Sequence, residues 1–336
     1  MPFCESFRRQ VMPQVVVDVA VSLVLFVSIA TTKVQPWSPP TSAISLRDFP
    51  EHVAKMHANG DFGFSKEHEL IRNAKRYPAV ASDANAEKNR YHGKVNAYDH
   101  SRFRLSSRVD SSDYINANYI DGYNSEKEYI ATQGPTPATM NDFWQMVWEA
   151  DVHIIVMVTS LNEGGMVKCD QYWPDKGQVW YDNVSVKFLT EDSGNLPTYV
   201  VRTFEVLRED EVRVVKQYHF LLWPDHGVPE QSTPLLSFVR EVRANVKPED
   251  GPMVVHCSAG VGRTGTFIAI DQSLQWVDRD TKLDIFGVVL RMRQQRNLMV
   301  HNEAQYTFIH DALLEVLNSS ATGVPASNFS SKQKEL

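Results

Sequence analysis

Two short apolar runs along the chain have the pattern of buried strands. Residues 152–159 read Val-His-Ile-Ile-Val-Met-Val-Thr, and residues 253–256 read Met-Val-Val-His. Continuous apolar runs of this length, rich in β-branched residues, are typical of strands that are covered on both faces of a sheet. Four further segments carry apolar residues at helical spacing and are predicted to be helices: residues 140–149, 235–246, 266–277 and 304–317.

Longer alternating stretches lie between these elements. Residues 179–189 and 199–222 alternate apolar and polar side chains, which predicts antiparallel hairpins within the same sheet. Strands that alternate with helices predict an α/β protein: a single domain with a twisted mixed β-sheet flanked by helices. We expect this domain to span residues 48–317 and to be followed by a disordered tail, residues 318–336, which is rich in Ser, Asn and Lys.

The first 47 residues have a different character. Two basic residues, Arg8 and Arg9, precede an apolar run over residues 15–30, and residues 33–45 are rich in Pro, Ser and Thr. A membrane helix needs about 20 apolar residues, so the interrupted run is short for a span and resembles a signal peptide. We predict a hydrophobic leader that associates the protein with a membrane, followed by an extended linker. The alternative is a disordered leader without a targeting role.

Composition narrows the classes of function. The 336 residues are 43% apolar and 22% charged, which predicts a globular protein, and the net charge of −7 argues against a nucleic-acid partner. The three cysteines, Cys4, Cys169 and Cys257, match neither a disulfide framework nor a zinc-ligand pattern. We therefore expect a reducing compartment and no metal or other cofactor.

The segment from Val254 to Thr266 carries the clearest chemistry. It reads as a buried strand, a glycine-rich loop and the start of a helix. The free backbone N–H groups of such a loop, together with the positive end of the helix dipole, favour a bound phosphate and the thiolate form of Cys257. A thiolate is a strong nucleophile, and the planar guanidinium of Arg263 can bind two phosphoryl oxygens at once.

Three other interpretations of this loop fit the sequence less well. The spacing Gly260-x-Gly262-x-x-Gly265 matches a dinucleotide-binding fingerprint, but the region after Val277 lacks the strand and acidic residue that such a fold requires. A P-loop nucleotide-binding site needs Gly-Lys-Ser/Thr, and Arg263 stands in the place of the lysine. A merely buried, inert cysteine would not account for the flanking histidine and arginine.

His256-Cys257-x5-Arg263-Thr264 resembles the catalytic motif of the protein tyrosine phosphatase family. Further blocks that resemble this family follow in order: Lys88-Asn89-Arg90-Tyr91, Asp113-Tyr114-Ile115-Asn116-Ala117-Asn118, Ala131-Thr132-Gln133-Gly134-Pro135, Lys168-Cys169-Asp170-Gln171-Tyr172-Trp173-Pro174 and Trp223-Pro224-Asp225-His226-Gly227-Val228-Pro229. The resemblance covers residues 48–317. It implies the cysteine-dependent phosphatase fold and the hydrolysis of phosphotyrosine on proteins through a phosphocysteine intermediate.

The resemblance also implies roles for single residues. Cys257 is the expected nucleophile, Asp225 the general acid and base, and Arg263 the phosphate ligand. Thr264 would assist the departing thiolate, although a threonine that opens a helix is equally a cap, and His256 would brace the loop. The implied substrate-binding residues are Tyr91, Asp225, Cys257, Ser258, Ala259, Gly260, Val261, Gly262, Arg263, His301 and Gln305.

Three supporting positions have simpler alternatives. Glu163 and Lys168 resemble the pair that steadies the arginine and the Asp225 segment, but either could be a solvated charge. Tyr91 resembles the aromatic wall of a slot sized for phosphotyrosine, where it would stack on the substrate ring. A tyrosine that only packs in the core is the alternative.

Two positions depart from the family pattern. The family usually has glutamine at the place of His301, where the amide positions the hydrolytic water, so His301 predicts a slower but working second step. A neutral imidazole can still orient water through one nitrogen, and Gln305 matches a supporting glutamine. Gly93 stands where an Asn or Asp normally holds the substrate backbone, so peptide recognition does not carry over from the family.

The subtype and setting follow from the same resemblance. Ala97 and the block Asp61-Phe62-Gly63-Phe64-Ser65 resemble the gamma/zeta class of receptor-type phosphatases, and the intact motifs resemble their active, membrane-proximal catalytic domain. The expected partners are phosphotyrosyl proteins, and the expected setting is a cytoplasmic domain of a single-pass membrane protein in signal transduction. Two alternative functions remain: a phosphotyrosine-binding pseudophosphatase, impaired because of His301, and a lipid or dual-specificity phosphatase, which would not be expected to have the Tyr91 block.

Overall fold

The computed structural model describes residues 43–79, 83–91, 93–106, 112–193 and 198–321. All of these lie within one compact unit that begins at Pro40. The predicted leader, most of the linker and the part of the predicted tail after residue 321 lie outside the described residues. Because the last helix continues to Ala321, it passes the predicted domain end at residue 317.

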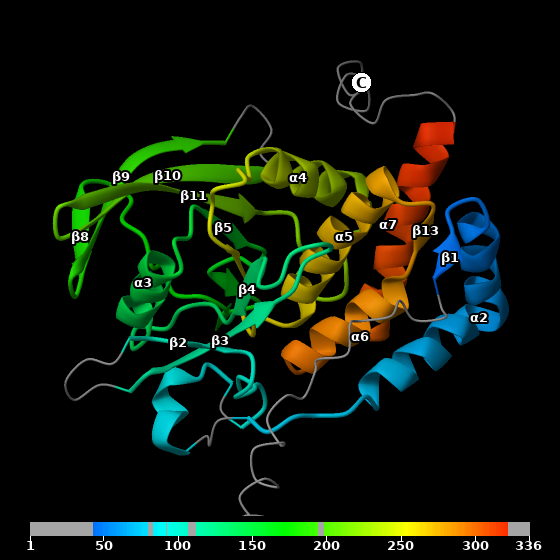
Figure 1. Cartoon of the computed structure of the whole chain (residues 1–336), viewed down its shortest axis with the longest axis horizontal. Coiled ribbons are helices and arrows are strands. Elements are labelled where there is room, and N and C mark those ends of the chain that lie inside the picture. The colour runs from blue at the N-terminus through cyan, green and yellow to red at the C-terminus, as the bar shows by residue number, and fades with distance from the viewer. Residues whose placement is uncertain (1–42, 80–82, 92, 107–111, 194–197, 322–336) are drawn as a thin grey trace, which may run out of the picture. The chain divides into compact units, whose positions relative to one another are not determined.

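Nine strands of the described chain form one sheet (Figure 1). In sheet order they are β2 (Arg102–Arg104), β3 (Tyr114–Ile120), β4 (Tyr129–Thr132), β12 (Met253–His256), β5 (Ile154–Met157), β11 (Glu211–Phe220), β10 (Tyr199–Arg208), β9 (Val184–Asp192) and β8 (Gln178–Tyr181). The central strands β4, β12, β5 and β11 pair in parallel, and the outer pairs are antiparallel. The sheet is therefore mixed, and β12 is one of its central parallel strands.

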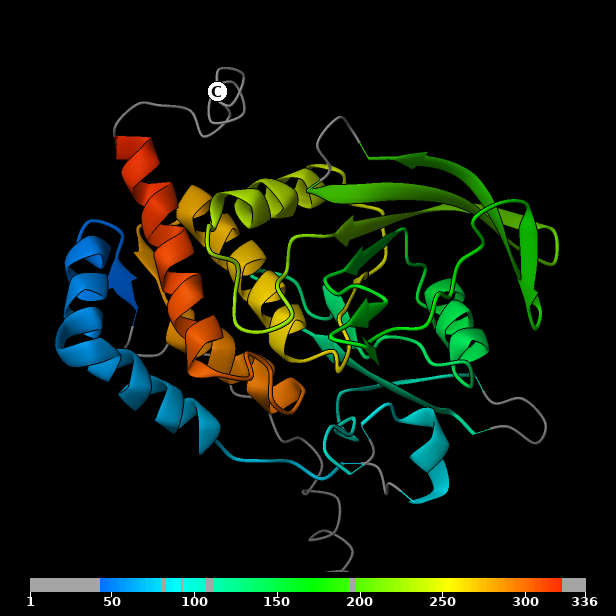
Figure 2. The same ribbon diagram turned by 180° about the vertical axis from the view of Figure 1, so that it is seen from behind.

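Helices cover both faces of this sheet, as the two opposite views show (Figures 1 and 2). They are α2 (Phe49–Arg72), α3 (Met140–Glu149), α4 (Thr233–Ala244), α5 (Gly262–Arg279), α6 (Ile285–Gln295) and α7 (Glu303–Ala321), with a short 3-10 helix η1 (Asp83–Lys88). Alternate residues of β12 serve the two cores: Val255 packs with α4 to α7, whereas Val254 packs with α3. Burial on both faces explains why this strand is a continuous apolar run.

Most of the elements predicted from the sequence are confirmed. The fold is a single α/β domain with a mixed sheet, β12 occupies the predicted residues, and α3, α4, α5 and α7 lie within about two residues of the predicted ends or extend beyond them. The two alternating stretches form the hairpins β8–β9 and β10–β11. Helix α2 and the strands β3 and β4 were not predicted as secondary structure.

Three short strand pairs lie outside the large sheet or at its margin. β1 (Ile44–Ser45) pairs with β13 (Lys282–Leu283), and β6 (Asn162–Glu163) pairs with β7 (Met166–Val167). A single bridge joins Ala79 to Tyr98. None of the helices within the described residues has the length and apolar character that a membrane span requires.

Candidate functional site

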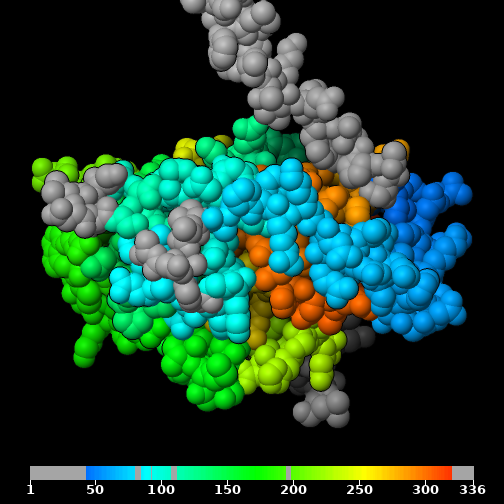
Figure 3. Space-filling model, turned by 90° about the horizontal axis from the view of Figure 1, so that it is seen from below, coloured from blue at the N-terminus to red at the C-terminus, as the bar shows by residue number. Residues whose placement is uncertain are grey.

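The Cys257 loop, residues 257–262, joins the end of β12 to the start of α5. It contains Cys257, Ser258, Ala259, Gly260, Val261 and Gly262, all of which were predicted as substrate-binding residues. Because β12 pairs in parallel with β4 and β5, the loop emerges at the carboxyl ends of parallel strands, where α/β proteins usually bind ligands. On the face seen in Figure 3, cyan, green, yellow-green and orange segments meet around a small area of yellow atoms.

The backbone of this loop turns around the sulfur of Cys257. The amide of Gly260 donates a hydrogen bond to Sγ at 3.2 Å. Gly260 itself has φ of +70°, and a Cβ atom at this position would lie 2.0 Å from the carbonyl oxygen of Thr132. Only glycine fits here, because the loop both takes a left-handed turn and lies against the backbone of β4.

A buried arginine holds the outer side of the loop backbone. Nε of Arg296 donates to the carbonyl of Gly260 at 2.8 Å, and Nη2 donates to the carbonyl of Ala259 at 3.2 Å. Nη1 donates to Oδ1 of Asn118 at 2.7 Å, so every nitrogen of the guanidinium is used. Burial lowers the pKa of Arg296 to about 10, and the side chain is still a cation at neutral pH. Since its carbonyls are bonded to Arg296, the loop can present its amides to an anion.

His256 braces the same loop from the opposite side of the cysteine. The amide of Gln217 donates to the hydroxyl of Tyr172 at 2.7 Å, and this hydroxyl lies 2.8 Å from Nε2 of His256. Because a carbonyl oxygen only accepts, Nδ1 carries the ring proton and donates to the carbonyl of Cys257 at 3.3 Å, and Nε2 of the neutral ring accepts from the Tyr172 hydroxyl. Burial lowers the pKa of His256 to about 3, so the ring is neutral and acts as a positioning group.

Arg263 lies in the first turn of α5 and forms a fork-like pair with Glu163. Nη1 and Nη2 are 2.5 and 2.8 Å from the two carboxylate oxygens. Burial raises the pKa of Glu163, but hydrogen bonds from Arg263, the amide of Ser160 and the hydroxyl of Thr159 outweigh it, and the net pKa is lowered. The carboxylate is thus charged and fixes the plane of the guanidinium, as expected for Glu163.

The Trp223 loop, residues 223–229, carries Asp225 and depends on the same arginine. Nη2 of Arg263 donates to the carbonyls of Pro224 at 3.1 Å and Asp225 at 3.4 Å. Trp223 is buried, and its ring faces the guanidinium at 5.7 Å. Asp225 is exposed, and its Oδ2 lies 3.0 Å from where a Cβ atom on Gly164 would stand. Arg263 therefore links the Cys257 loop to the loop of the predicted acid.

Tyr91 is joined to the Cys257 loop through a hydroxyl pair. Its OH lies 2.9 Å from Oγ of Ser258, which in turn donates to the carbonyl of Lys168 at 2.7 Å. The neighbouring Arg90 holds the Tyr91 segment by hydrogen bonds to the carbonyls of Gly134 and Pro135. Tyr91 is half-buried, and its role as an aromatic wall stays a prediction.

His301 and Gln305 flank the start of α5. A Cβ atom on Gly262 would lie 2.9 Å from Nε2 of Gln305 and 3.3 Å from Cβ of His301. Oε1 of Gln305 accepts a hydrogen bond from the amide of His301 at 2.9 Å. Partial burial and the charge of Arg293 lower the pKa of His301, which favours the neutral imidazole at neutral pH.

Two predicted residues differ in how far the structure brings them into this site. Thr264 is buried, and its hydroxyl has no hydrogen-bond partner among the described residues, so it can serve a group in the loop. Lys168 contributes its backbone carbonyl, while no hydrogen bond or ion pair of its ammonium group is found within the described part of the chain. A direct link from Lys168 to the Trp223 loop stays a prediction.

The buried groups behind the loop were not predicted from the sequence. Arg296 contacts the loop, Tyr172 contacts His256, and Gln217 contacts Tyr172. Arg293 donates to the carbonyls of Met299 and Val300 just before His301. Tyr172 lay within a quoted family block, but no sequence pattern shows that its hydroxyl reaches His256. The sequence signal for the buried roles of Arg293 and Arg296 was limited to their position as basic residues near the end of an apolar helical segment.

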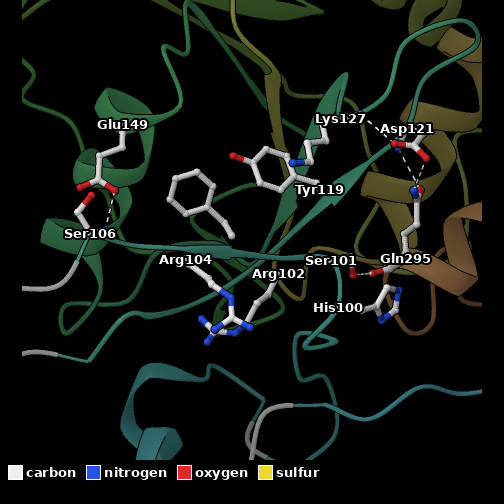
Figure 4. Close-up of a pocket in the computed structure, with 11 residues that line it drawn as sticks. His100, Ser101, Arg102, Arg104, Ser106, Tyr119, Asp121, Lys127, Glu149 and Gln295 are labelled. Carbon is white, nitrogen blue, oxygen red and sulfur yellow. Dashed lines mark hydrogen bonds between the residues drawn. The ribbon is translucent and has the colours of Figure 1, made fainter. Parts of the chain in front are cut away.

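A separate hollow of about 560 Å³ lies beside β2 and β3 (Figure 4). Its carboxylates are already bonded: Asp121 accepts from the amide of Lys127 and from Gln295, and Glu149 accepts from the amide of Ser106. It contains none of the predicted site residues. Within the described residues, no three His, Cys, Asp or Glu side chains form a group that could hold a metal ion.

The chain is similar to several known proteins. A family model described as protein-tyrosine phosphatase matches residues 85–315. Receptor-type tyrosine-protein phosphatase F of Danio rerio is 50% identical over 297 residues, which cover 87% of this chain and 15% of the relative. The protein of the same name from Homo sapiens is 49% identical over 292 residues, with 85% and 15% covered. Receptor-type tyrosine-protein phosphatase S of Gallus gallus is 48% identical over 292 residues, with 85% and 19% covered.

The chain thus spans less than a fifth of the length of these relatives. They are of the F and S types, and none of the three is of the gamma or zeta type suggested by Ala97 and the Asp61–Ser65 block.

Proposed function

Because this chain belongs to the protein-tyrosine phosphatase family, we propose that it hydrolyses phosphotyrosine on proteins through a phosphocysteine intermediate. One observation carries the proposal. The sulfur of Cys257 accepts a hydrogen bond from the backbone amide of Gly260 within a loop whose carbonyls are bonded to Arg296, beside the guanidinium of Arg263. This arrangement suits a thiolate and a phosphoryl group at the same place.

In the first step the Cys257 thiolate attacks phosphorus. The S–P bond forms as the P–O bond to tyrosine breaks, and Asp225 gives its proton to the leaving phenolate oxygen. Arg263 and the loop amides bind the phosphoryl oxygens, where charge is spread in the transition state. The neutral His256 holds the loop through the carbonyl of Cys257 without exchanging a proton itself.

In the second step water attacks the phosphocysteine. Asp225, now a carboxylate, takes a proton from this water, the P–S bond breaks, and the thiolate is regenerated as inorganic phosphate leaves. Thr264, with its unpaired hydroxyl, stabilises the departing thiolate by donating a hydrogen bond. His301 and Gln305 lie beside Gly262, a position suited to orienting the water.

Tyr91 selects for the length of the substrate side chain. Its hydroxyl is fixed to Ser258 of the loop, so its ring forms a wall above the phosphate position. A phosphotyrosine ring can stack on this wall, whereas a phosphoserine is too short to bring its phosphate to the loop. Lys168 and Glu163 support this arrangement, Glu163 through Arg263 and Lys168 through its carbonyl.

We assign the domain to the cytoplasmic side of a membrane-bound receptor. The support is the receptor-type name of the relatives, together with a thiolate chemistry that needs a reducing compartment. The leader of residues 1–47 would provide the membrane association. Imaging the full chain and a variant without residues 1–32 tests this, because equal distribution of the two would remove any targeting role of the segment.

Phosphate release from a phosphotyrosyl peptide tests the enzymatic proposal. We expect Cys257→Ser to remove release, and Cys169→Ser, at the other buried cysteine of the described chain, to keep most of it. Release by Cys257→Ser at the wild-type rate would refute the proposal. Formation of phosphocysteine without steady turnover would identify the pseudophosphatase instead, and faster release from phosphothreonine or phosphoinositide would identify the third class of phosphatase.

A further inference from the structure

The hairpin β6–β7 presents two exposed apolar side chains at the mouth of the candidate site. Met166 is 61% exposed and Val167 is 52% exposed, although both are apolar. The strands pair Glu163 with Met166 and Asn162 with Val167, joined by a tight Gly164-Gly165 turn. Cross-strand partners share a face, so Met166 lies on the same face as Glu163, whose carboxylate binds Arg263.

This hairpin also bridges the two segments that flank the Cys257 loop. At its turn, Gly164 lies against the carboxylate of Asp225. Beyond its second strand, the carbonyl of Lys168 accepts from Ser258, the partner of the Tyr91 hydroxyl. The carbonyl of Val167 accepts from Arg90 at 3.4 Å. Met166 therefore stands between the predicted acid and the predicted aromatic wall.

The chemistry of the rim at Met166 is apolar and adaptable. A methionine side chain is flexible and polarizable, so it fits apolar and aromatic groups of different shapes. Gly93, close to Tyr91 in the chain, has no side chain with which to hold a substrate peptide. An apolar contact at Met166 would compensate for this missing polar contact.

We propose that Met166 is a specificity-determining residue that favours substrates with an apolar side chain close to the phosphotyrosine. The inference rests on the proposed function, because it assumes that a phosphotyrosyl peptide enters between Tyr91 and Asp225. A leucine or aromatic residue of the substrate next to phosphotyrosine covers the thioether and removes exposed apolar surface from water.

The test compares pairs of phosphotyrosyl peptides that differ at a single position, which is leucine in one peptide and serine in the other. The varied position is one of the two residues before or the two residues after the phosphotyrosine. At one position at least, we expect leucine to raise kcat/KM about 5- to 10-fold, as partial burial of one side chain allows. Met166→Ser should bring this ratio to about 1, and Met166→Leu should preserve it. Val212→Ser, at an equally exposed valine of β11, is the matched control and should leave the ratio unchanged.

The ratio of two peptides is independent of how much of a variant is folded, so a general loss of stability does not imitate the effect. Wild-type turnover without preference for leucine at any position would overturn the proposal, as would a preference that survives in Met166→Ser. Dissociation constants of the same peptides with Cys257→Ser and Cys257→Ser/Met166→Ser separate the two hypotheses. Preference in binding without turnover by the wild type would reject the proposed function and support the role of Met166.

Discussion

The Cys257 loop and the Trp223 loop serve one site but are held in different ways. The Cys257 loop lies between buried groups: Arg296 bonds two of its carbonyls, His256 bonds a third, and Gly260 lies against the backbone of β4. The Trp223 loop is exposed from Pro224 to Gly227, and two hydrogen bonds from Arg263 hold its backbone.

This difference matches the two tasks. A group that stabilises charge in the transition state works best when its dipoles are fixed in advance, because no free energy is then spent on reorienting them. The loop that carries a general acid must open to admit substrate and to release product. Loops that close over substrates are commonly exposed and sparsely bonded. Arg263 directly follows the Cys257 loop and donates to two carbonyls of the Trp223 loop, so phosphate bound to it can also favour closure of the Trp223 loop.

Alanine substitution at one glycine in each loop tests the comparison most strongly. Gly260 and Gly227 both have positive φ, +70° and +80°, but only Gly260 has backbone atoms where a Cβ would stand. We expect Gly260→Ala to lower kcat/KM about 10³-fold, because it displaces the loop that binds phosphate. The free energy of unfolding should also fall by about 3 kcal/mol.

Gly227→Ala is the matched variant, since it introduces the same backbone strain without a clash. Gly227→Ala should lower the free energy of unfolding by about 1 kcal/mol, and it should lower kcat/KM less than Gly260→Ala does. Urea denaturation and kinetics on a phosphotyrosyl peptide measure both effects. Equal losses of kcat/KM and of unfolding free energy in the two variants would show that the two loops do not differ in rigidity.

Asp225→Asn tests the exposed side of the comparison. The amide cannot protonate the leaving phenolate, so kcat should fall about 10²-fold, with little change in the free energy of unfolding because the side chain is exposed. The loss should be smaller for p-nitrophenyl phosphate, whose leaving group needs less protonation. Glu230→Gln, at an exposed carboxylate just after the loop, is the control. A loss independent of the leaving group would contradict the role of Asp225 as acid.

The two loops also differ in how far the sequence predicted them. Short patterns predicted the strand, loop and helix around Cys257 because burial, glycine and helix spacing are local properties of the chain. The order of Trp223-Pro224-Asp225 was recognised by resemblance alone, since an exposed turn has no periodicity. The contacts of Arg296 and Tyr172 were not predicted, because they join residues far apart in the sequence.

Helix α2 shows why some of the fold escaped prediction. Its apolar residues follow helical spacing, but Ala58 to Asp61 leave helical geometry, and Gly60 and Gly63 interrupt the pattern. Glycine is unfavourable within helices, so the sequence favoured a break where the structure has a kinked helix. Strand β3 was hidden for another reason: buried asparagines, Asn116 and Asn118, interrupt its apolar run while bonding to neighbouring segments.

Acid should lower the free energy of unfolding, because three buried histidines are neutral in the folded protein. Burial lowers the pKa of His256 to about 3, His219 to about 4 and His310 to about 3, against about 6.5 in the unfolded chain. Between these values the unfolded state binds protons that the folded state does not. Stability is therefore full above about pH 6.5 and falls as the pH drops toward 4, by up to about 1.4 kcal/mol per pH unit for each histidine.

Urea denaturation at pH 7 and pH 5 measures this dependence. His310→Gln removes one titrating group far along the chain from the Cys257 loop, so the slope of stability against pH should become less steep by about 1.4 kcal/mol per pH unit. His57 acts in the opposite direction, since hydrogen bonds to Asp311 and Asp61 raise its pKa. A stability that does not change between the two pH values would show that these rings are protonated in the folded protein.

The smallest expected effect concerns His301, which lies beside the Cys257 loop yet is exposed like the Trp223 loop. Its lowered pKa leaves one ring nitrogen free to accept a hydrogen bond from water at neutral pH. The acceptor and donor nitrogens of an imidazole point in different directions, whereas the oxygen and nitrogen of a glutamine amide lie together at the end of the side chain. We expect His301→Gln to raise steady-state turnover a few-fold, roughly 1 kcal/mol, without changing the rate of cysteine attack.

Rapid-mixing kinetics should show a burst of phenol release and accumulated phosphocysteine in the wild type, and a smaller burst in the variant. His301→Ala should be slower than both, because it removes the acceptor altogether. Identical turnover of the wild type and His301→Gln would mean that the imidazole orients the hydrolytic water as well as a glutamine does, and would refute a slowed second step.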